Sequence, residues 1–250
     1  MQLSFVFNEK TFSIDTSKPI DISLGVRHDG LGVNCFYTNQ ALFKPYSAGN
    51  FVGNVAAGGV CNVDVIIFTP HGNGTHTECI GHITELQQSI SDALLQGIMT
   101  VQLISVMPEN SNDDFIITKQ LLSDCVQLNG AEALIVRTIP NMPSKKRMDY
   151  SGSNPPYFTH EALGLLNDLG VKHLLCDLPS VDKEDDGGKL LAHKAFFGEG
   201  QKSRFDATIT ELVYCEDSVN DGMYLLDIQI ANFQSDASPS RPILYQMMDL

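Results

Sequence analysis

Apolar residues along this chain repeat at strand-like and helix-like spacings. In the stretch 60–68 (VCNVDVIIF), apolar side chains occupy alternate positions, which predicts a strand with one buried face. The apolar run 98–106 predicts a second strand. Two helix-then-strand units follow, with helices expected at 118–128 and 159–169. The strands of these units and the later strands are expected at 131–137, 171–178, 208–214, 223–230 and 243–247.

Both predicted helices have recognisable ends. Thr118 and Thr159 suit the N-cap positions, and Gly130 and Gly170 supply the left-handed residue that closes a helix. In the second helix, the apolar stripe is predicted to consist of Ala162, Leu165, Leu166 and Leu169. Apolar strands flanked by helices indicate an α/β fold with a mixed sheet. Because no repeat or linker interrupts the chain, we expect a single domain over residues 1–250.

The charge balance argues against several classes of partner. The chain has 30 acidic and 16 basic residues, so its net charge of −14 disfavours both nucleic-acid binding and anionic membranes. No apolar run reaches the roughly 20 residues of a membrane-spanning helix, and the N-terminus does not resemble a signal peptide. The six cysteines lack a CxxC pair, which indicates free thiols in a reducing compartment. We therefore expect a cytoplasmic protein that acts on a small-molecule substrate.

The densest polar cluster is the segment 71–82 (HGNGTHTECIGH), directly after the predicted strand 60–68. It holds His71, His76, Glu78 and His82 within twelve residues. Imidazole and carboxylate groups are good ligands of first-row divalent ions, so this density predicts a metal or catalytic site. The segment contains no HExxH pair, and the site is therefore expected on a loop rather than on a helix.

The spacing within this segment indicates how it folds. His76 and Glu78 are two residues apart, so an extended backbone points both side chains to the same side. The glycines of the segment permit tight turns that let His71 fold back toward the same ion. His82 then lies nearby without having to ligate, which suits a general acid or base.

The segment resembles the signature HxGTHxDxPxH of the metal-dependent cyclase-like hydrolases, a family that includes bacterial kynurenine formamidase and isatin hydrolase. The resemblance continues in Asp21-Ile22-Ser23, in 177–182 (DLPSVD) and in 238–242 (SPSRP), and so covers nearly the whole chain. It implies a swivelling β/β/α fold. It also implies one or two divalent ions, with zinc as the first choice and manganese as the second.

The resemblance assigns roles to individual residues. It implies that the metal ligands are His71, His76, Glu78, His193 and Glu211. It implies that His82 is the general acid and base, which passes a proton to the leaving nitrogen after a metal-activated water attacks an amide carbonyl. It implies no organic cofactor.

The chain departs from the family signature at three positions. Asn73 is an extra residue before the GTH triplet, Glu78 replaces the usual Asp, and Ile80 replaces the usual Pro. Because Glu78 is longer by one methylene, the number of ions that it contacts, one or two, is left open. The substrate is left open as well.

Several residues have two interpretations. Ser180, Phe36 and Tyr37 are the candidate substrate contacts, with a turn or core packing as the alternative. Three more residues suit either the neighbourhood of the site or a purely structural role: Asp177, Asp182 and Arg241. The histidines without polar companions in the sequence are expected to be structural or exposed: His28, His160 and His173.

The favoured functional hypothesis is an arylformamidase that hydrolyses N-formylkynurenine to kynurenine and formate, a step of tryptophan catabolism. One alternative is a ring hydrolase acting on isatin, a lactam or a cyclic ester. The other is a non-catalytic protein that binds a metal or a small molecule. Association as a homodimer or homotetramer is also expected, since symmetric homo-oligomers are common among soluble enzymes.

Overall fold

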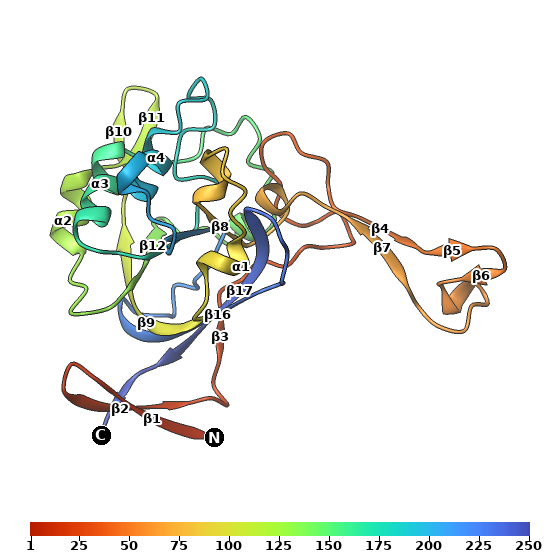
Figure 1. Ribbon diagram of the computed structural model, residues 1–250, viewed down its shortest axis with the longest axis horizontal. Coiled ribbons are helices and arrows are strands. Elements are labelled where there is room, and N and C mark those ends of the chain that lie inside the picture. Colours follow the sequence, from red (N-terminus) through yellow and green to blue (C-terminus); the bar gives the residue numbers. More distant parts are fainter.

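The computed structural model describes residues 1–250, and its centre is a mixed β-sheet that closes on itself (Figure 1). The strands of the closed sheet are β8 (His76–Cys79), β9 (Ile98–Val106), β12 (Ala133–Thr138), β14 (His173–Cys176), β15 (Thr208–Glu211), β16 (Gly222–Ile230) and β17 (Ala237–Gln246). They follow the order β16-β9-β12-β14-β15-β8-β17, and β17 pairs back onto β16 to complete a seven-stranded barrel. Strand β3 (Ile20–Asp21) extends the sheet beyond β17. The predicted α/β fold with a mixed sheet is therefore confirmed.

Helices cover one side of this barrel (Figure 1). They are α2 (Lys119–Cys125), α3 (His160–Asp168) and α4 (Leu191–Phe197), while the short α1 (Ile90–Ala93) lies near β8. The predicted N-caps are confirmed, because the Thr118 side chain accepts a hydrogen bond from the amide of Leu121 and that of Thr159 accepts one from Ala162.

Alternate residues of the central strands divide the core in two. On β12, Leu134 and Val136 face the helices and belong to a cluster of 21 buried residues. Ala133 and Ile135 face the enclosed side of the sheet and belong to a second cluster of 15. Because both faces are covered, the first four residues of the strand (ALIV) are all apolar rather than alternating.

Two three-stranded sheets lie outside the barrel. The first joins β1 (Gln2–Phe7), β2 (Lys10–Asp15) and β18 (Met248–Asp249), which brings the two ends of the chain together. The second joins β10 (Glu109–Ser111), β11 (Asp114–Ile117) and β13 (Tyr157–Phe158) near the helices. No helix in the structure has both the length and the apolar character needed to cross a membrane.

A long ribbon projects from the barrel at the right of Figure 1. It contains β4 (Leu42–Pro45), β5 (Ser47–Ala48), β6 (Phe51–Val52), the 3-10 turn Val55–Ala57 and β7 (Asp64–Ile67). We call the segment Leu42–Ile67 the arm. The prediction of a buried strand over 60–68 is wrong, because β7 pairs only with β4 and Val60 is 89% exposed. Alternating apolar residues indicate a strand face that is stable only when other protein packs against it. Within one chain, no other element packs against this face of β7.

The other differences concern the ends and faces of elements. Helix α2 ends at Cys125, and α3 buries Leu163 while Leu169, just past the last helical residue, is 46% exposed. Strand β17 begins earlier than expected and includes the SPSRP segment. In that strand Arg241 forms an ion pair with Asp21 at the surface. Arg241 therefore has the structural role, the second of its two interpretations.

Asp177, directly after strand β14, makes a buried ion pair. Its carboxylate lies 2.7 Å from the Lys145 ammonium and accepts hydrogen bonds from the amide and hydroxyl of Thr138. Burial raises the pKa of this carboxyl, and Lys145 and Thr138 oppose that shift. Asp177 thus fastens the loop after β12 to the barrel, which is the structural role.

Replacing Lys145 with Met leaves the Asp177 charge buried and unpaired. We expect the free energy of unfolding to fall by roughly 3–5 kcal/mol. Urea denaturation followed by circular dichroism measures this change. The control is Lys146→Met, which removes an exposed pair with Glu216 and is expected to cost about 1 kcal/mol or less. Equal effects of the two substitutions would contradict the assignment.

Candidate metal centre

Strand β8 carries the first two members of the predicted site. His76 and Glu78 point to the same side of the strand, as the spacing predicts, and both side chains are buried. The antiparallel pairing of β15 sets Glu211 opposite His76. The Nε2 atom of His76 consequently lies 3.4 Å from Oε2 of Glu211.

The loop before β8 brings His71 to the same place. His71 lies in the 3-10 turn Pro70–Gly72, and its Nε2 atom is 3.4 Å from Oε2 of Glu78. Gly72 is required, because a Cβ atom there would meet the Thr38 hydroxyl at 2.3 Å. His71 thus belongs to the cluster although one more residue than in the family signature separates it from the GTH triplet.

The extra residue Asn73 has its own structural role. Its buried side chain accepts a hydrogen bond from the amide of Thr69 at 2.8 Å. It donates to the side chain of Asn34 and to the carbonyl of Asn39. These bonds satisfy the amide group fully on the inner side of the turn, so the added residue stabilises the loop.

Helix α4 supplies His193 from the far part of the chain. Asp182 accepts hydrogen bonds from the amides of Ala192 and His193 at the start of the helix. The same carboxylate lies 2.6 Å from Nδ1 of His193. This contact directs Nε2 toward Glu78, whose Oε1 atom is 2.9 Å away. Asp182 thus orients a site residue, the first of its two interpretations.

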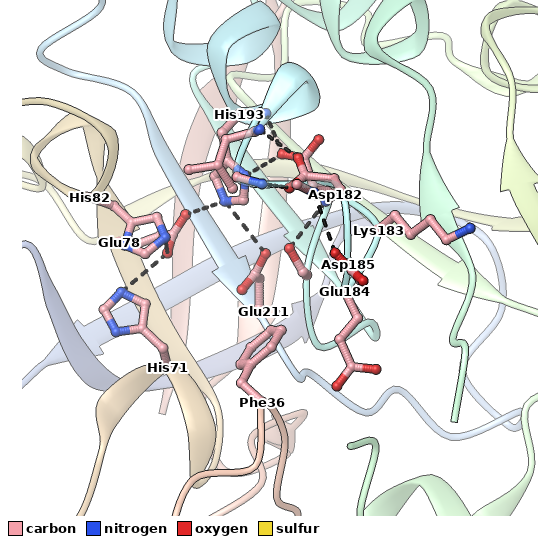
Figure 2. A pocket seen from close by; sticks show the side chains of 15 residues that line it. Phe36, His71, Glu78, His82, Asp182, Lys183, Glu184, Asp185, His193 and Glu211 are labelled. Carbon is pink, nitrogen blue, oxygen red and sulfur yellow. Dashed lines mark hydrogen bonds and ion pairs between the residues drawn. The ribbon is translucent and has the colours of Figure 1, made fainter. Parts of the chain in front are cut away.

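The five predicted ligands thus come from four separate elements and meet around Glu78. Figure 2 shows four of them: His71, Glu78, His193 and Glu211. Glu78 and His193 are 1% and 2% exposed at their side chains, and Nε2 of His193 is also 4.0 Å from Glu211. Ligand atoms of His76, Glu78 and Glu211 all lie within 4.8 Å of one another.

The polar atoms at the centre of this cluster are buried and lie close to one another, but none makes a well-directed hydrogen bond. These atoms are Nε2 of His71, His76 and His193 and both carboxylate oxygens of Glu78. Buried polar atoms are almost always hydrogen-bonded, and three imidazoles with a carboxylate are donors that suit zinc or another first-row ion. The residues present therefore fit a divalent metal.

Protonation supports the same conclusion. Burial opposes the charged form of His193, but the Glu78 charge and the close contacts with Asp182 and Glu78 raise its pKa to about 10. Burial also opposes ionisation of Glu78, yet the imidazoles of His82, His193 and His71 hold the pKa of its carboxyl well below the usual range. A cation balances a buried carboxylate in the same way as these protons, so metal binding would displace them.

His82 lies beside the cluster and makes a contact that the sequence did not predict. Its Nε2 atom is 3.9 Å from Oε2 of Glu78, and its Nδ1 atom is 3.3 Å from Oδ2 of Asp236. The same oxygen of Asp236 is 3.2 Å from Nε2 of His71. Both imidazoles hold the pKa of the Asp236 carboxyl far below its usual range.

Asp236 is the site residue that sequence reasoning missed. It directly precedes β17, which pairs with β8 so that Ala237 lies opposite Glu78. The only signal in the sequence is the position of Asp236 shortly before the SPSRP segment. That position does not indicate which residues Asp236 contacts.

A cavity of about 340 Å³ opens onto the cluster. Phe36 and Ser180 line it, as expected for substrate contacts, whereas Tyr37 is 77% exposed and does not line it. The backbone of Phe36 has φ 57°, an uncommon conformation for a large residue. The loop 182–188 forms much of the wall.

The remaining histidines and the cysteines lie apart from the centre. His173 is buried and bonds Thr208, while His28 and His160 are exposed, as predicted. All six cysteines are free, four of them buried.

The chain matches the model of a protein family described as "Putative cyclase" over residues 2–183, which include the whole segment from His71 to His82. The chain belongs to this cyclase family. His193 and Glu211 lie beyond the matched residues.

Similar proteins of named activity support the same family assignment. The chain is 29% identical over 188 residues to a kynurenine formamidase of Bacillus cytotoxicus, a match of 74% of this chain and 81% of the relative. A kynurenine formamidase of Bacillus thuringiensis subsp. konkukian is 28% identical, with the same shares covered.

Solved structures share the fold over more of the chain. A "predicted metal-dependent hydrolase" from Bacillus stearothermophilus superposes with a TM-score of 0.62 at 18% identity, covering 91% of this chain and 98% of that one. Isatin hydrolase A from Labrenzia aggregata superposes with a TM-score of 0.64 at 14% identity, covering 93% and 94%. At these identities the likeness establishes the fold.

Asp182→Asn tests whether Asp182 orients a metal ligand. The amide lacks the charge that holds the His193 ring, so we expect zinc affinity to fall by about 10- to 100-fold. Competition with a chromophoric chelator measures the affinity, and circular dichroism checks the fold. Asp185→Asn is the matched control, because Asp185 lines the same cavity without touching His193. Unchanged affinity in both variants would remove Asp182 from the site.

Proposed function

We propose that this protein is a metal-dependent hydrolase of formyl amides and that its reaction is the arylformamidase one, N-formylkynurenine and water giving kynurenine and formate. Membership of the cyclase family and the named relatives support a cyclase-like hydrolase as the general class. The observation that carries the proposal is the set of buried, unbonded imidazole and carboxylate atoms around Glu78.

Five residues would hold the metal: His71, His76, Glu78, His193 and Glu211. Zinc is the first choice and manganese the second. A divalent cation held there lowers the pKa of water and polarises a carbonyl group. Glu78 lies close to His76 and Glu211 on one side and to His193 and His71 on the other, so its two oxygens allow one ion or two.

His82 moves the proton in this proposal. Asp236 accepts the hydrogen of Nδ1, which leaves the lone pair of Nε2 directed toward the cluster. Nε2 takes a proton from the attacking water and returns it to the leaving nitrogen as the carbon–nitrogen bond breaks. The charge of Glu78 raises the pKa of His82, and burial opposes that shift.

The cavity wall supports a substrate that carries an amine. Glu184, Asp185 and Asp186 line it, and the one lysine there, Lys183, is paired with Asp114 at 2.7 Å. This excess of negative charge favours a protonated amine. N-formylkynurenine carries one, with its carboxylate turned away from this wall, and isatin carries none, which favours the formamide. Phe36 offers an aromatic face for the ring of such a substrate.

The deciding experiment measures metal content and hydrolysis together. Protein prepared without chelator is analysed for zinc and manganese, and N-formylkynurenine hydrolysis is followed before and after metal removal. We expect stoichiometric metal and turnover that returns when metal is restored. Hydrolysis of isatin, lactams or cyclic esters instead would replace the substrate assignment. Bound metal without any turnover would indicate the non-catalytic alternative, and failure to bind either ion would refute the site.

His82→Ala separates proton transfer from metal binding. Since His82 is not among the five proposed ligands, we expect metal content to stay unchanged while kcat falls by about 10²- to 10⁴-fold. His160→Ala is the control, because His160 is exposed on α3 and far in sequence from the site. Activity that survives in His82→Ala would show that another group moves the proton.

Asp236→Asn tests the orientation of His82. The amide can donate to Nδ1 instead of accepting from it, which places the proton on Nε2 and removes the base. We expect kcat to fall by about 10²-fold or more, with KM nearly unchanged. Metal analysis of the variant is needed as well, because Asp236 also contacts His71. Asp92→Asn, on the exposed side of α1, is the control. Full activity with Asn at position 236 would limit Asp236 to packing.

A further inference from the structure

A second group of metal-ligating side chains lies at the edge of the metal centre. It consists of His71, His82 and Asp236, and we call it the outer triad. One ligand atom from each of these residues lies within 4.8 Å of the other two. Nε2 of His71 and Nδ1 of His82 are 3.2 Å and 3.3 Å from the same oxygen of Asp236, Oδ2. Two imidazoles and one carboxylate are a ligand set that suits first-row divalent ions.

The separations within the outer triad fit ligands around an ion better than strong hydrogen bonds. A charge-assisted hydrogen bond from nitrogen to a carboxylate oxygen is about 2.7–2.9 Å long, and both contacts with Asp236 are longer. Neighbouring ligands of a tetrahedral zinc ion with bonds of about 2.0–2.1 Å are about 3.3–3.4 Å apart. Nε2 of His71 is also buried without a well-directed hydrogen bond. The triad therefore has the spacing of a zinc site.

Neighbouring groups hold the triad in place and leave it accessible. The rings of His71 and His82 stack with centroids 4.4 Å apart and lie side by side in Figure 2. The Ser235 hydroxyl donates to Oδ1 of Asp236 at 3.0 Å, which leaves Oδ2 for the imidazoles. Two cavities reach the triad, because the one of about 340 Å³ is lined by both histidines and another of about 560 Å³ is lined by Asp236. An ion can therefore enter from outside the centre.

We propose that the outer triad is a second metal site, which binds zinc when zinc is in excess and thereby inhibits the enzyme. Zinc is the expected ion because sites with nitrogen ligands bind it more tightly than manganese. The existence of the site is independent of the substrate, whereas its inhibitory effect rests on the proposed function.

His71 connects the outer triad with the centre. Its Nε2 atom is 3.4 Å from Glu78 and 3.2 Å from Asp236, and the one lone pair of this nitrogen can bind only one ion. When the outer ion takes His71, the centre keeps its other four proposed ligands, which are His76, Glu78, His193 and Glu211. We therefore expect the central metal to stay bound while the outer triad fills.

Zinc at the outer triad disables His82 as a base. Nδ1 of His82 gives its lone pair to the ion, so the one proton of the neutral ring moves to Nε2. In the proposed reaction, Nε2 is the atom that takes the proton from the attacking water. An occupied triad leaves no lone pair for that step, and hydrolysis stops without loss of the central metal.

The test titrates zinc onto full-length protein that already carries its central metal, with equilibrium dialysis and elemental analysis as the measurement. We expect one additional zinc per chain. Asp236→Asn should raise the dissociation constant of this additional zinc by about 10- to 100-fold or more, because loss of even a supporting contact costs that much. His82→Ala should weaken it as well. Asp92→Asn is the matched control, since Asp92 lines the same cavity as Asp236 outside the triad, and circular dichroism checks each fold.

Crystals soaked in zinc locate the ion directly. Diffraction on both sides of the zinc absorption edge should show an ion about 2.0–2.2 Å from His71 Nε2, His82 Nδ1 and Asp236 Oδ2. The site is overturned if no additional zinc binds, if Asp236→Asn binds it unchanged, or if the ion lies at other residues.

The inhibitory role has its own measurement. Hydrolysis of N-formylkynurenine should fall with the same midpoint at which the additional zinc binds. Undiminished hydrolysis with the triad filled would overturn this role. If the protein hydrolyses no formamide at all, the dialysis and diffraction results still decide whether the outer triad binds zinc, so the two proposals can fail separately.

Discussion

One buried carboxylate organises the centre of this protein. Glu78 is 1% exposed, lies within a barrel strand, and has no well-directed hydrogen bond to either oxygen. A lone charge in such a place is very costly, so positive charge must accompany it. Three imidazoles converge on it for this reason, and protons or a metal ion can fill the space between them.

The barrel makes this convergence possible by placing distant segments on the two flanks of β8. Strand β15 brings Glu211 on one side, and β17 brings Asp236 on the other. The helix side of the barrel then supplies His193, which Asp182 holds in orientation. His76, Glu78 and Glu211 lie on barrel strands and Asp236 directly precedes one, so this part of the site follows from the pairing register.

The sequence predicted those parts of the structure that local chemistry determines. The N-caps, strand β9 and the common side of His76 and Glu78 depend on neighbouring residues and are confirmed. Asp236 could not be found in this way, because its role arises from the pairing of β17 with β8. The arm was misplaced for a related reason. Its apolar alternation shows that the ribbon needs cover, but no single-chain pattern states which molecule provides it.

Asn73 shows how a binding loop can change length while its ligands stay together. The added residue turns its amide inward, where it bonds Thr69, Asn34 and Asn39. The inserted residue thus supplies the hydrogen bonds that stabilise the longer loop. Search patterns that demand one fixed gap between the first histidine and the GTH triplet would pass over such chains. A pattern that allows a variable gap, with asparagine at the added place, would recover them.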